Sequence, residues 1–563
     1  MISDKKAIQD IVALLEKKGV THVIITPGSR NAPFSLSLYK HPSFQVMSVV
    51  DERSAAFIAL GIAQQSDKPV ALICTSGTAA LNYAPAIAEA FYQEVPLIVI
   101  TADRPMEWVN QGEGQTINQS GVFKNFVRAS FDIIQDMDDK DFEWYNARVM
   151  NEAIDRAMSP VRGPIHLNFP LRESLYKKVD HPKAEVKVIT TVTKEIALPL
   201  SALHELGTSI SSKRKVIILV GQFHTCKTTK SLLKKWSEFP NVLVLTESHS
   251  GLEDDAFIGC IDRMLNTLRE EEMEQFRPEL VIAIGKNIIS RKIKALLRHD
   301  EVEHWYVSED AQLLDTFQRL TLIVPVTPER FFEDVITFVQ TPPTNYRERF
   351  MSLNAAKKNV GNDFASNAAF SDLKASFEIM QHLPANSLIQ MGNSSVARYI
   401  QLFDRPEHLR FSGNRGVSGI DGCTSTAIGA AMMSDKVTTL ISGDVSFLYD
   451  SNAFWNKYVP DNLKVIVINN GGGGIFRIID GPSSTDALEE FFETHHDRSA
   501  GDIAQLYQLP FYQATDESTL KVGLKWLYAQ KHCAVLEVMT PRLENDKILK
   551  EYFKTIKENT TLS

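Results

Sequence analysis

The feature that most constrains this fold is the repeated alternation of short apolar segments with helix-like segments. The apolar segments form three blocks of five: 23–25, 46–50, 70–74, 97–100 and 165–167; 216–220, 242–245, 280–284, 304–307 and 320–326; 387–390, 409–411, 437–441, 463–468 and 534–538. Strands that are almost continuously Val, Ile and Leu belong to parallel sheets covered by helices on both faces. We therefore expect three parallel-sheet α/β domains, with ligands bound beyond the carboxyl ends of the strands.

Composition shifts separate the three blocks. A polar, lysine-rich stretch follows the first block, and Thr341-Pro342-Pro343-Thr344 follows the second. The predicted domains cover residues 1–180, 195–340 and 350–563. The outer blocks end their strands in turns rich in Gly, Ser, Thr and Arg, whereas the middle block has plainer strand ends apart from Gly285-Lys286 and Arg291-Lys292. We expect the outer domains to carry the chemistry and the middle one to support them.

Charge and cysteine content exclude several classes of protein. A formal net charge of −9 is atypical of a general nucleic-acid binder. The N-terminus lacks the apolar core of a signal peptide, and no apolar run reaches membrane-spanning length. We therefore expect a soluble, cytoplasmic protein. The cysteines lack CxxC spacing and are predicted to be reduced and mostly buried thiols; they are Cys74, Cys226, Cys260, Cys423 and Cys533.

Two strand ends in the third block carry ligands suited to a hard cation. The first apolar segment leads into Gly443-Asp444, and the next leads into Asn469-Asn470 and the run Gly471–Gly474. Carboxylate, amide and carbonyl oxygens suit a hard divalent cation, and uncovered backbone N–H groups suit a phosphate. Each fragment alone is a common turn sequence. Together, one helix and one strand apart, they predict a site for Mg²⁺ and a diphosphate.

The pair resembles the thiamine diphosphate motif, Gly-Asp-x followed about two dozen residues later by Asn-Asn. Val445 stands where many members of that superfamily have a second glycine. The resemblance implies a carboxyl group on another domain that hydrogen-bonds the aminopyrimidine ring of the cofactor and has a pKa raised by an apolar pocket. Glu52 fits, because it opens a helix after the apolar segment 46–50. By itself, Glu52 is typical of an acid that favours a helix N-terminus.

Further segments extend the resemblance along nearly the whole chain. They are Thr26-Pro27-Gly28-Ser29-Arg30-Asn31-Ala32-Pro33, Asp51-Glu52-Arg53, Thr75-Ser76-Gly77-Thr78-Ala79, Thr101-Ala102-Asp103-Arg104-Pro105 and residues 413–422. They resemble the MenD family, the 2-succinyl-5-enolpyruvyl-6-hydroxy-3-cyclohexene-1-carboxylate (SEPHCHC) synthases of menaquinone biosynthesis. The resemblance implies a transferase that decarboxylates 2-oxoglutarate and adds the succinyl carbanion to isochorismate in a conjugate, Stetter-like fashion.

The implied substrates each carry two carboxylates, which arginine recognises well. By resemblance, the substrate pocket contains Ser29, Arg30, Arg104, Gln115, Ser394, Arg398 and Arg415, with an apolar wall of Ile475 and Phe476. One basic residue of the middle block is expected to reach the acceptor substrate. Whether this residue is Arg291 or Lys292 is open.

The remaining implied residues hold the cofactor and its metal. Asp444, Asn470 and the carbonyl of Gly472 would bind Mg²⁺ or Mn²⁺, while His495-His496 are expected to be loop residues. The residues expected against thiamine diphosphate are Thr75, Gly77, Asn393, Ser394, Ile420, Gly443, Asp444, Val445, Asn470, Gly472, Gly473 and Ile475. The resemblance also implies a homo-oligomer, a dimer or tetramer, with active sites at the subunit interface.

Three alternatives remain at this point. The first is another thiamine diphosphate enzyme, such as an acetolactate synthase-like or decarboxylating lyase. The second is a Rossmann protein, although the chain lacks a G-x-G-x-x-G that opens a first βα turn. The third is an inactive paralogue that acts as a scaffold, which would need neither Glu52 nor the Asp444 and Asn470 pair.

Overall fold

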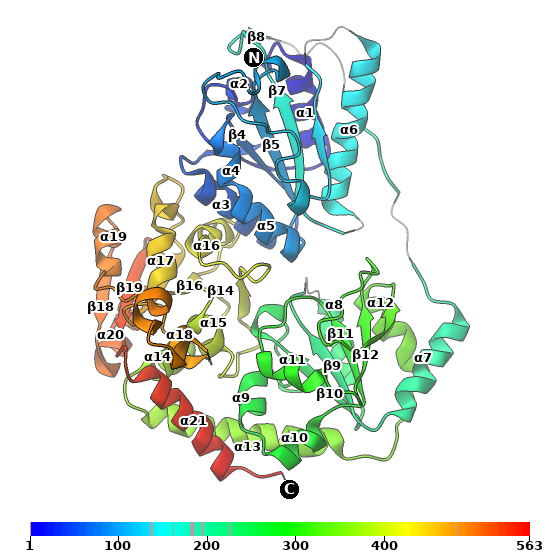
Figure 1. Ribbon diagram of the computed structural model, residues 1–563, viewed down its shortest axis with the longest axis vertical. Coiled ribbons are helices and arrows are strands. Elements are labelled where there is room, and N and C mark those ends of the chain that lie inside the picture. The colour runs from blue at the N-terminus through cyan, green and yellow to red at the C-terminus, as the bar shows by residue number, and fades with distance from the viewer. Residues whose placement is uncertain are drawn as a thin grey trace. The chain divides into compact units, whose positions relative to one another are not determined.

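The computed structural model of this protein describes residues 2–135, 139–159, 161–180, 186–192, 196–223, 227–479 and 481–562 (Figure 1). Three parallel sheets with helices on their faces confirm the predicted fold class. The chain divides into two compact units, described separately below. The first unit comprises residues 1–193, 414–438 and 446–463, and the second comprises residues 194–413, 439–445 and 464–563. The predicted domain boundaries stay a prediction.

The first sheet has the strand order β3-β2-β4-β5-β7-β6. Its strands are β2 (His22–Ile25), β3 (Gln45–Ser48), β4 (Val70–Cys74), β5 (Leu97–Asp103), β6 (Ser130–Asp132) and β7 (Ile165–Pro170). The helices used below are α3 (Glu52–Ser66) and α5 (Ala84–Gln93). The sequence did not predict β6, because its three residues are half-buried and carry no apolar run. The strand before Glu52 was expected to be buried; β3 is instead an edge strand whose one buried residue is Met47.

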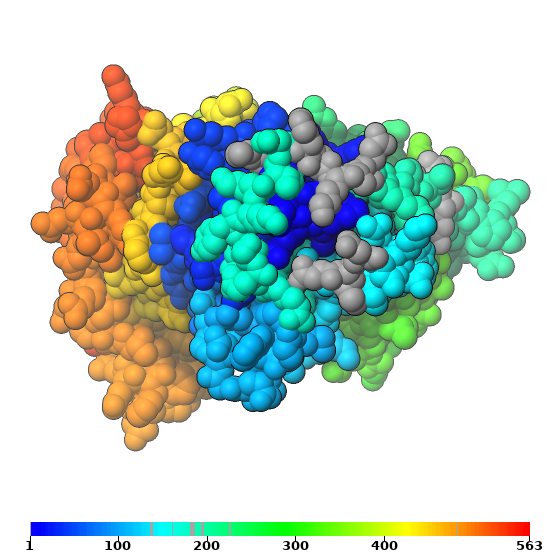
Figure 2. Space-filling model, turned by 90° about the horizontal axis from the view of Figure 1, so that it is seen from above, coloured from blue at the N-terminus to red at the C-terminus, as the bar shows by residue number. Residues whose placement is uncertain are grey.

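The polar stretch after β7 is attached to the first domain. A short strand β8 (Lys178–Val179) pairs antiparallel with β1 (Ile2–Ser3). Lys18 Nζ donates to Ile189 O at 2.6 Å, and Asn151 Nδ2 donates to Lys187 O at 2.9 Å. In Figure 2 this blue-green segment lies beside the dark blue N-terminal residues.

The middle sheet has the order β10-β9-β11-β12-β13. Its strands are β9 (Val216–Val220), β10 (Val242–Thr246), β11 (Leu280–Ile284), β12 (Glu303–Val307) and β13 (Leu320–Val324). Both faces are covered, by one apolar cluster around Trp236 and another around Phe276. The first strand along the chain lies inside the sheet, so a topological switch point falls between β9 and β11.

The third sheet has the order β15-β14-β16-β17-β19-β18. Its strands are β14 (Leu388–Met391), β15 (Arg410–Gly413), β16 (Thr438–Gly443), β17 (Leu463–Asn469), β18 (Phe511–Ala514) and β19 (Ala534–Met539). The sequence missed β18, where a half-exposed Phe-Tyr-Gln-Ala segment at the sheet edge lacks a long apolar run. The switch point lies between β14 and β16, and β17 lies on the other side of β16. The predicted metal motif therefore follows adjacent strands.

Two findings bear on the predictions from composition, for the part of the chain that the structure describes. Cys74, Cys260, Cys423 and Cys533 are buried and form no disulfide bond, whereas Cys226 lies outside the described residues. Within the described ranges, no helix combines the length and the hydropathy needed to cross a membrane.

Candidate active site

In the second unit, Asp444 lies at the end of β16, where helix α17 (Asp444–Tyr449) begins. Asp444 is 4% exposed. Asp444 Oδ1 accepts a hydrogen bond from Val445 N, and Oδ2 accepts one from Gly472 N, both at 2.8 Å. The second bond joins the end of β16 to the glycine run after β17. The two halves of the predicted motif therefore meet, as their positions on adjacent strands require.

The two asparagines at the end of β17 have different roles. Asn469 Nδ2 donates to Glu537 Oε1 at 2.8 Å, and its Oδ1 accepts from Gly471 N at 3.0 Å. Asn470 Nδ2 donates to the buried Asp372 Oδ2 at 2.9 Å. Among the described residues, Asn470 Oδ1 is a buried oxygen without a hydrogen-bond partner. Asn469 is therefore a structural residue, and Asn470 keeps an oxygen that a ligand could use.

The glycine run bends sharply beside Asn470. Gly472 has φ +149°, and a Cβ there would lie 2.6 Å from Glu493 O, so no larger residue fits without movement. The same carbonyl accepts a hydrogen bond from Gly473 N at 2.6 Å. The Glu493 side chain is fully buried and pairs with Arg477 and Arg542. Sequence reasoning missed Glu493, because its partners lie in separate segments of the chain.

His495 and His496 lie in a loop, as expected, but His496 also approaches the motif. His496 Nε2 lies 3.4 Å from Asp444 Oδ2. The nearby carboxylate of Asp444 raises the pKa of His496, against the opposing effect of burial. The sequence gave no signal for this contact, because adjacent histidines in a polar loop have no distinguishing pattern.

The switch point of the third sheet is open. Gly392 N donates to Ile441 O at 2.7 Å, which places Asn393 and Ser394 beside the end of β16. Ser394 has φ +68°, in the left-handed region. A Cβ on Gly443 would meet no described atom within 4 Å. Asn393 is buried and Ser394 is half-buried. A diphosphate placed here would meet backbone N–H groups rather than packed side chains.

The predicted substrate residues of the second unit form a charged group. Arg398 is on α15 (Ser395–Ile400), and Arg291 and Lys292 open α11 (Arg291–Leu297). Burial lowers the pKa of Arg398, Asp262 opposes that effect and the charge of Arg291 adds to it. Burial raises the pKa of Asp262, while Ser290, Arg398 and Lys292 lower it. Asp262 is therefore close to both basic segments, and the choice between Arg291 and Lys292 stays open.

The apolar wall predicted at Ile475 and Phe476 lies on the short helix α18 (Ile475–Ile478), which begins directly after the glycine run. Both residues are half-buried. The Phe476 ring lies 5.8 Å from the ring of Phe492, centroid to centroid.

In the first unit, Glu52 is the first residue of α3. The helix-capping role belongs to its neighbour, because Asp51 accepts a hydrogen bond from Ser54 N at 3.1 Å. Asp51 also accepts one from Asn452 Nδ2 at 2.8 Å. Burial raises the pKa of Glu52; its own backbone amide opposes this, and Asp51 adds to it. The helix cap is therefore supplied by Asp51 rather than by Glu52, and the raised pKa of Glu52 makes its protonated form easier to populate.

The turn after β4 lies against a loop of the same unit. Ser76 Oγ donates to Gln115 O at 2.9 Å, and Gly77 N donates to Gln119 Oε1 at 2.8 Å. Gln119 is 1% exposed, and its amide also donates to Ala102 O and Asn168 Oδ1, both at 3.2 Å. Sequence reasoning named Thr75, Gly77 and Gln115 but missed Gln119. Residues 115–119 lie in a loop, where spacing gives no signal that distinguishes Gln119.

The turn after β4 also contacts the segment that contains Ser29 and Arg30, and the first unit includes Arg104 as well. Arg30 N donates to Thr75 Oγ1 at 3.3 Å, and a Cβ on Gly28 would lie 2.2 Å from Thr75 Cβ. Arg30 is 5% exposed and pairs with Glu173 at 3.1 Å. Arg104 donates to Gly114 O at 3.4 Å, and Ser29 is exposed. Burial lowers the pKa of Arg30, and the charge of Arg104 adds to that effect.

Arg415 and Ile420 lie in the loop that leads into helix α16 (Cys423–Met432), which packs against α3. Glycines allow the contact: a Cβ on Gly61 would lie 2.1 Å from Thr426 O, and one on Gly429 would lie 2.1 Å from Ile58 O. The helix that begins at Glu52 and the helix after Ile420 are therefore in close backbone contact. Arg415 and Ile420 are both half-buried.

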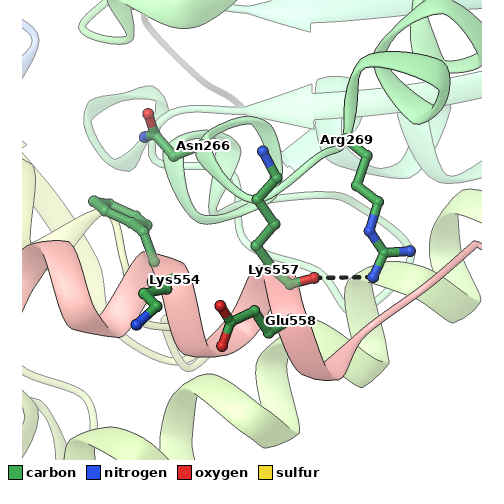
Figure 3. A pocket seen from close by; sticks show the side chains of 6 residues that line it. Asn266, Arg269, Lys554, Lys557 and Glu558 are labelled. Atoms are coloured by element: carbon green, nitrogen blue, oxygen red, sulfur yellow. Dashed lines mark hydrogen bonds between the residues drawn. The ribbon is translucent and has the colours of Figure 1, made fainter.

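A separate hollow of about 510 Å³ lies elsewhere in the second unit (Figure 3). It contains none of the predicted site residues. Its lining comes from α21 (Asn545–Asn559) and the segment before α10 (Glu270–Phe276), and consists of Asn266, Arg269, Phe553, Lys554, Lys557 and Glu558. Lys554, Lys557 and Glu558 are exposed, so these charges are largely solvated.

The residues present fit a divalent cation bound to a diphosphate. The hydrogen bond from Asn470 Nδ2 to Asp372 orients Asn470 Oδ1. Asp444 belongs to the same motif. A Cβ on Gly443 would meet no described atom within 4 Å. Within the described ranges, no cluster of three or more His, Cys, Asp or Glu side chains could hold a metal. One carboxylate, one amide and one carbonyl are hard oxygen ligands of the type that Mg²⁺ accepts.

This architecture is that of the thiamine diphosphate-dependent enzymes. Residues 5–122 match the family described as thiamine pyrophosphate enzyme, N-terminal TPP binding domain. The fold is similar to the crystal structure of benzoylformate decarboxylase from Polynucleobacter necessarius, with a TM-score of 0.73, 16% identity, and coverage of 96% of this chain and 99% of that one. The cofactor of this class is thiamine diphosphate.

Full-length relatives narrow the class. The chain is 40% identical over 561 residues to the 2-succinyl-5-enolpyruvyl-6-hydroxy-3-cyclohexene-1-carboxylate synthase of Flavobacterium johnsoniae, covering 99% of this chain and 100% of the relative. It is 38% identical over 568 residues to the synthase of the same name from Porphyromonas gingivalis, covering 98% of each. The chain belongs to the SEPHCHC synthase family.

Proposed function

We propose that this protein is a SEPHCHC synthase, which decarboxylates 2-oxoglutarate and adds the resulting succinyl group to isochorismate. The observation that carries the proposal is the Asp444 and Asn470 pair, with one amide oxygen left for a ligand, in a chain that is similar over its full length to named synthases. An inactive scaffold would have no need to keep a buried oxygen unsatisfied, because such an oxygen is destabilising.

When bound, thiamine diphosphate would supply a nucleophilic carbon and a thiazolium ring that accepts the electrons released on decarboxylation. Asp444, Asn470 Oδ1 and Gly472 O would hold Mg²⁺ or Mn²⁺ against its diphosphate. Asn393, Ser394 and the N–H groups near Gly443 would hold the phosphate oxygens. The N–H of Gly473, which was expected to join them, already donates to Glu493 O. Val445, Ile420, Ile475 and the turn at Thr75 and Gly77 would enclose the rest.

Glu52 would hold and transfer the proton of the cofactor's aminopyrimidine ring. The direction of its pKa shift supports this role, because a raised pKa makes the protonated carboxyl easier to populate. Arg30 and Arg104, which act electrostatically on each other, would bind carboxylate oxygens together with Ser29, Gln115 and Arg415. Arg398 and either Arg291 or Lys292 would add positive charge from the second unit, beside Ser394 and Phe476.

We also propose that the protein acts in the cytoplasm as a homo-oligomer. This proposal rests on the family resemblance, which implies that the residues matching Glu52 and the metal motif meet across a subunit interface. Size-exclusion chromatography with light scattering would decide between a dimer and a tetramer; a monomer that retains full activity would overturn the proposal.

The decisive test is product formation. The protein with thiamine diphosphate and Mg²⁺ should convert 2-oxoglutarate and isochorismate into the cyclohexene product and CO₂, measured by mass spectrometry. Turnover of pyruvate alone would instead favour an acetolactate synthase-like enzyme.

Glu52→Gln should lower kcat by about 10²–10⁴-fold, because the amide cannot exchange the proton. Calorimetric titration should show that cofactor binding survives. Full activity in this variant would remove Glu52 from the mechanism.

A further inference from the structure

Glu89 is a buried acid in the first unit and is not one of the predicted site residues. It lies on α5, and 2% of its surface is exposed. Its Oε1 accepts a hydrogen bond from Gly416 N at 2.5 Å, and its Oε2 accepts from Val417 N at 2.7 Å and from Ser418 N at 3.3 Å. Gln93 Nε2, one helical turn later, also donates to Oε1. One carboxylate therefore takes three consecutive backbone donors from a segment more than 300 residues away.

The four donors that face the two carboxyl oxygens favour the charged form of Glu89, although burial leaves its pKa raised overall. Burial raises the pKa of Glu89, while the bonds from Gln93 and from the N–H groups of residues 416–418 lower it. Among the described residues, Glu89 forms no ion pair with a Lys or Arg. The backbone donors thus take the place of a counter-ion, as in other sites where successive N–H groups surround an anion.

The three donors lie between two predicted site residues. Arg415 precedes Gly416, and Ile420 follows Ser418 by two positions. The loop is also anchored at each end: Asn414 Nδ2 donates to Thr426 Oγ1 at 2.9 Å, and Ile420 O accepts from Ser446 Oγ at 2.9 Å. Glu89 holds the middle, where Ser418 has φ +66° and a Cβ on Gly416 would lie 2.6 Å from Glu89 O.

We propose that Glu89 is a positioning residue for the reaction: its carboxylate fixes residues 416–418 and thereby holds Arg415 and Ile420 in their binding positions. This inference rests on the function proposed above. Loss of Glu89 should release the loop without removing any group that touches a ligand. A merely structural role, by contrast, would lower stability and leave the substrate and cofactor constants unchanged.

Glu89→Gln separates these roles, because the variant keeps the side-chain length. Its amide group would place N–H donors against the N–H groups of the loop, so at least one bond is replaced by a repulsion. Hydrogen exchange of the unliganded protein should speed up by about 10–100-fold in peptides covering residues 414–422, the factor expected for loss of a bond to a charged group. Glu94→Gln on the same helix end is the matched control, since Glu94 pairs with Arg128 rather than with the loop.

The inference also predicts that Glu89→Gln changes KM more than kcat. Glu89→Gln should raise the KM for 2-oxoglutarate by about tenfold or more and lower kcat less, while Glu94→Gln stays within about twofold of the wild type. In the Arg415→Ala variant, the additional change Glu89→Gln should raise KM by a smaller factor than in the wild type. The reason is that the group positioned by Glu89 is already absent.

These experiments distinguish failure of this inference from failure of the proposed function. If the wild-type protein forms no cyclohexene product, the function fails, while hydrogen exchange still reports on the anchor. If the wild type is active and Glu89→Gln leaves exchange and KM unchanged, the inference is overturned. If Glu89→Gln does not fold, Glu89→Asp, which keeps the charge on a shorter side chain, should give the same changes at smaller size; unchanged exchange and KM in that variant also overturn it.

Discussion

The middle and third sheets of this protein have the same kind of switch point and use it in opposite ways. In the middle sheet, the chains leaving β9 and β11 pair with each other. Gln222 N donates to Lys286 O at 2.5 Å, and Lys286 N donates to Gln222 O at 2.8 Å. A Cβ on Gly221 would lie 2.3 Å from Lys286 O, so the two backbones touch. This crevice is closed by the protein itself.

In the third sheet, the corresponding crevice between β14 and β16 stays open. Gly392 approaches β16 as Gly221 approaches the chain after β11. Gly443 faces space free of described atoms, and Asn470 next to it keeps a buried oxygen without a partner among those residues. A parallel sheet therefore provides a place for a ligand, and the backbone beyond its strand ends decides whether that place is available.

The largest difference is expected between Asp444, which follows β16, and Asp310, which follows β12 and pairs with Lys286 beyond β11. Asp444→Ala should weaken Mg²⁺-dependent binding of thiamine diphosphate by about 100-fold or more, because it removes a charged ligand and the bond to Gly472. Asp310→Ala, which breaks the 3.2 Å ion pair with Lys286 in the middle domain, should leave that binding within about twofold. Titration calorimetry measures both, and equal losses would break the comparison.

The adjacent asparagines should separate stability from binding. Asn469→Ala removes bonds to Glu537, Arg498 O and Gly471 and should lower the free energy of unfolding by about 2–3 kcal/mol. Asn470→Ala loses only the bond to Asp372 and should cost less stability, but it should weaken metal-dependent cofactor binding by about 10–100-fold. Urea unfolding and cofactor titration of both variants test this; a reversed order would exchange their roles.

Two glycines test the crevices directly. Gly221→Ala should lower the free energy of unfolding by about 1–3 kcal/mol, because a methyl group cannot fit against Lys286 O without backbone movement. Gly443→Ala should change unfolding by less than about 0.5 kcal/mol and yet weaken cofactor binding, because its methyl group occupies ligand space. Normal cofactor affinity in Gly443→Ala would place the diphosphate elsewhere.

The smallest expected effect is a pH dependence that comes from the middle sheet. Burial lowers the pKa of His304, on β12, to about 4. In the unfolded chain this histidine takes up a proton near pH 6.5, whereas in the folded chain it does so only near pH 4. The stability present above pH 6.5 is therefore lost as the pH falls towards 4. Between pH 7 and 5.5 this loss should be about 1 kcal/mol and should disappear in His304→Leu. Exposed His408→Gln is the control, and an unchanged pH slope in His304→Leu would contradict the assignment.

Most of the fold was predictable from local pattern. Buried parallel strands need apolar side chains on both faces, so each such strand is visible as a Val, Ile and Leu run. Strands without that pattern were missed: β6 and β18 lie at sheet edges, and the short pair β1 and β8 forms through contacts between distant segments. The edge strand β3 was placed correctly but wrongly expected to be buried, because sheet order cannot be seen in one segment.

The chemical residue types at the strand ends were also set by the sequence alone. Asp444 and Asn470 follow strands that are adjacent in the sheet, so a shared site followed from their spacing, and Glu52 followed from the resemblance. The tertiary structure decided what each group has left to offer. The amide of Asn469 donates to Glu537, and Asp51 rather than Glu52 caps α3. Glu89 accepts hydrogen bonds from a loop more than 300 residues away. These outcomes depend on hydrogen bonds between residues far apart in the chain, and only packing determines which donors and acceptors are satisfied.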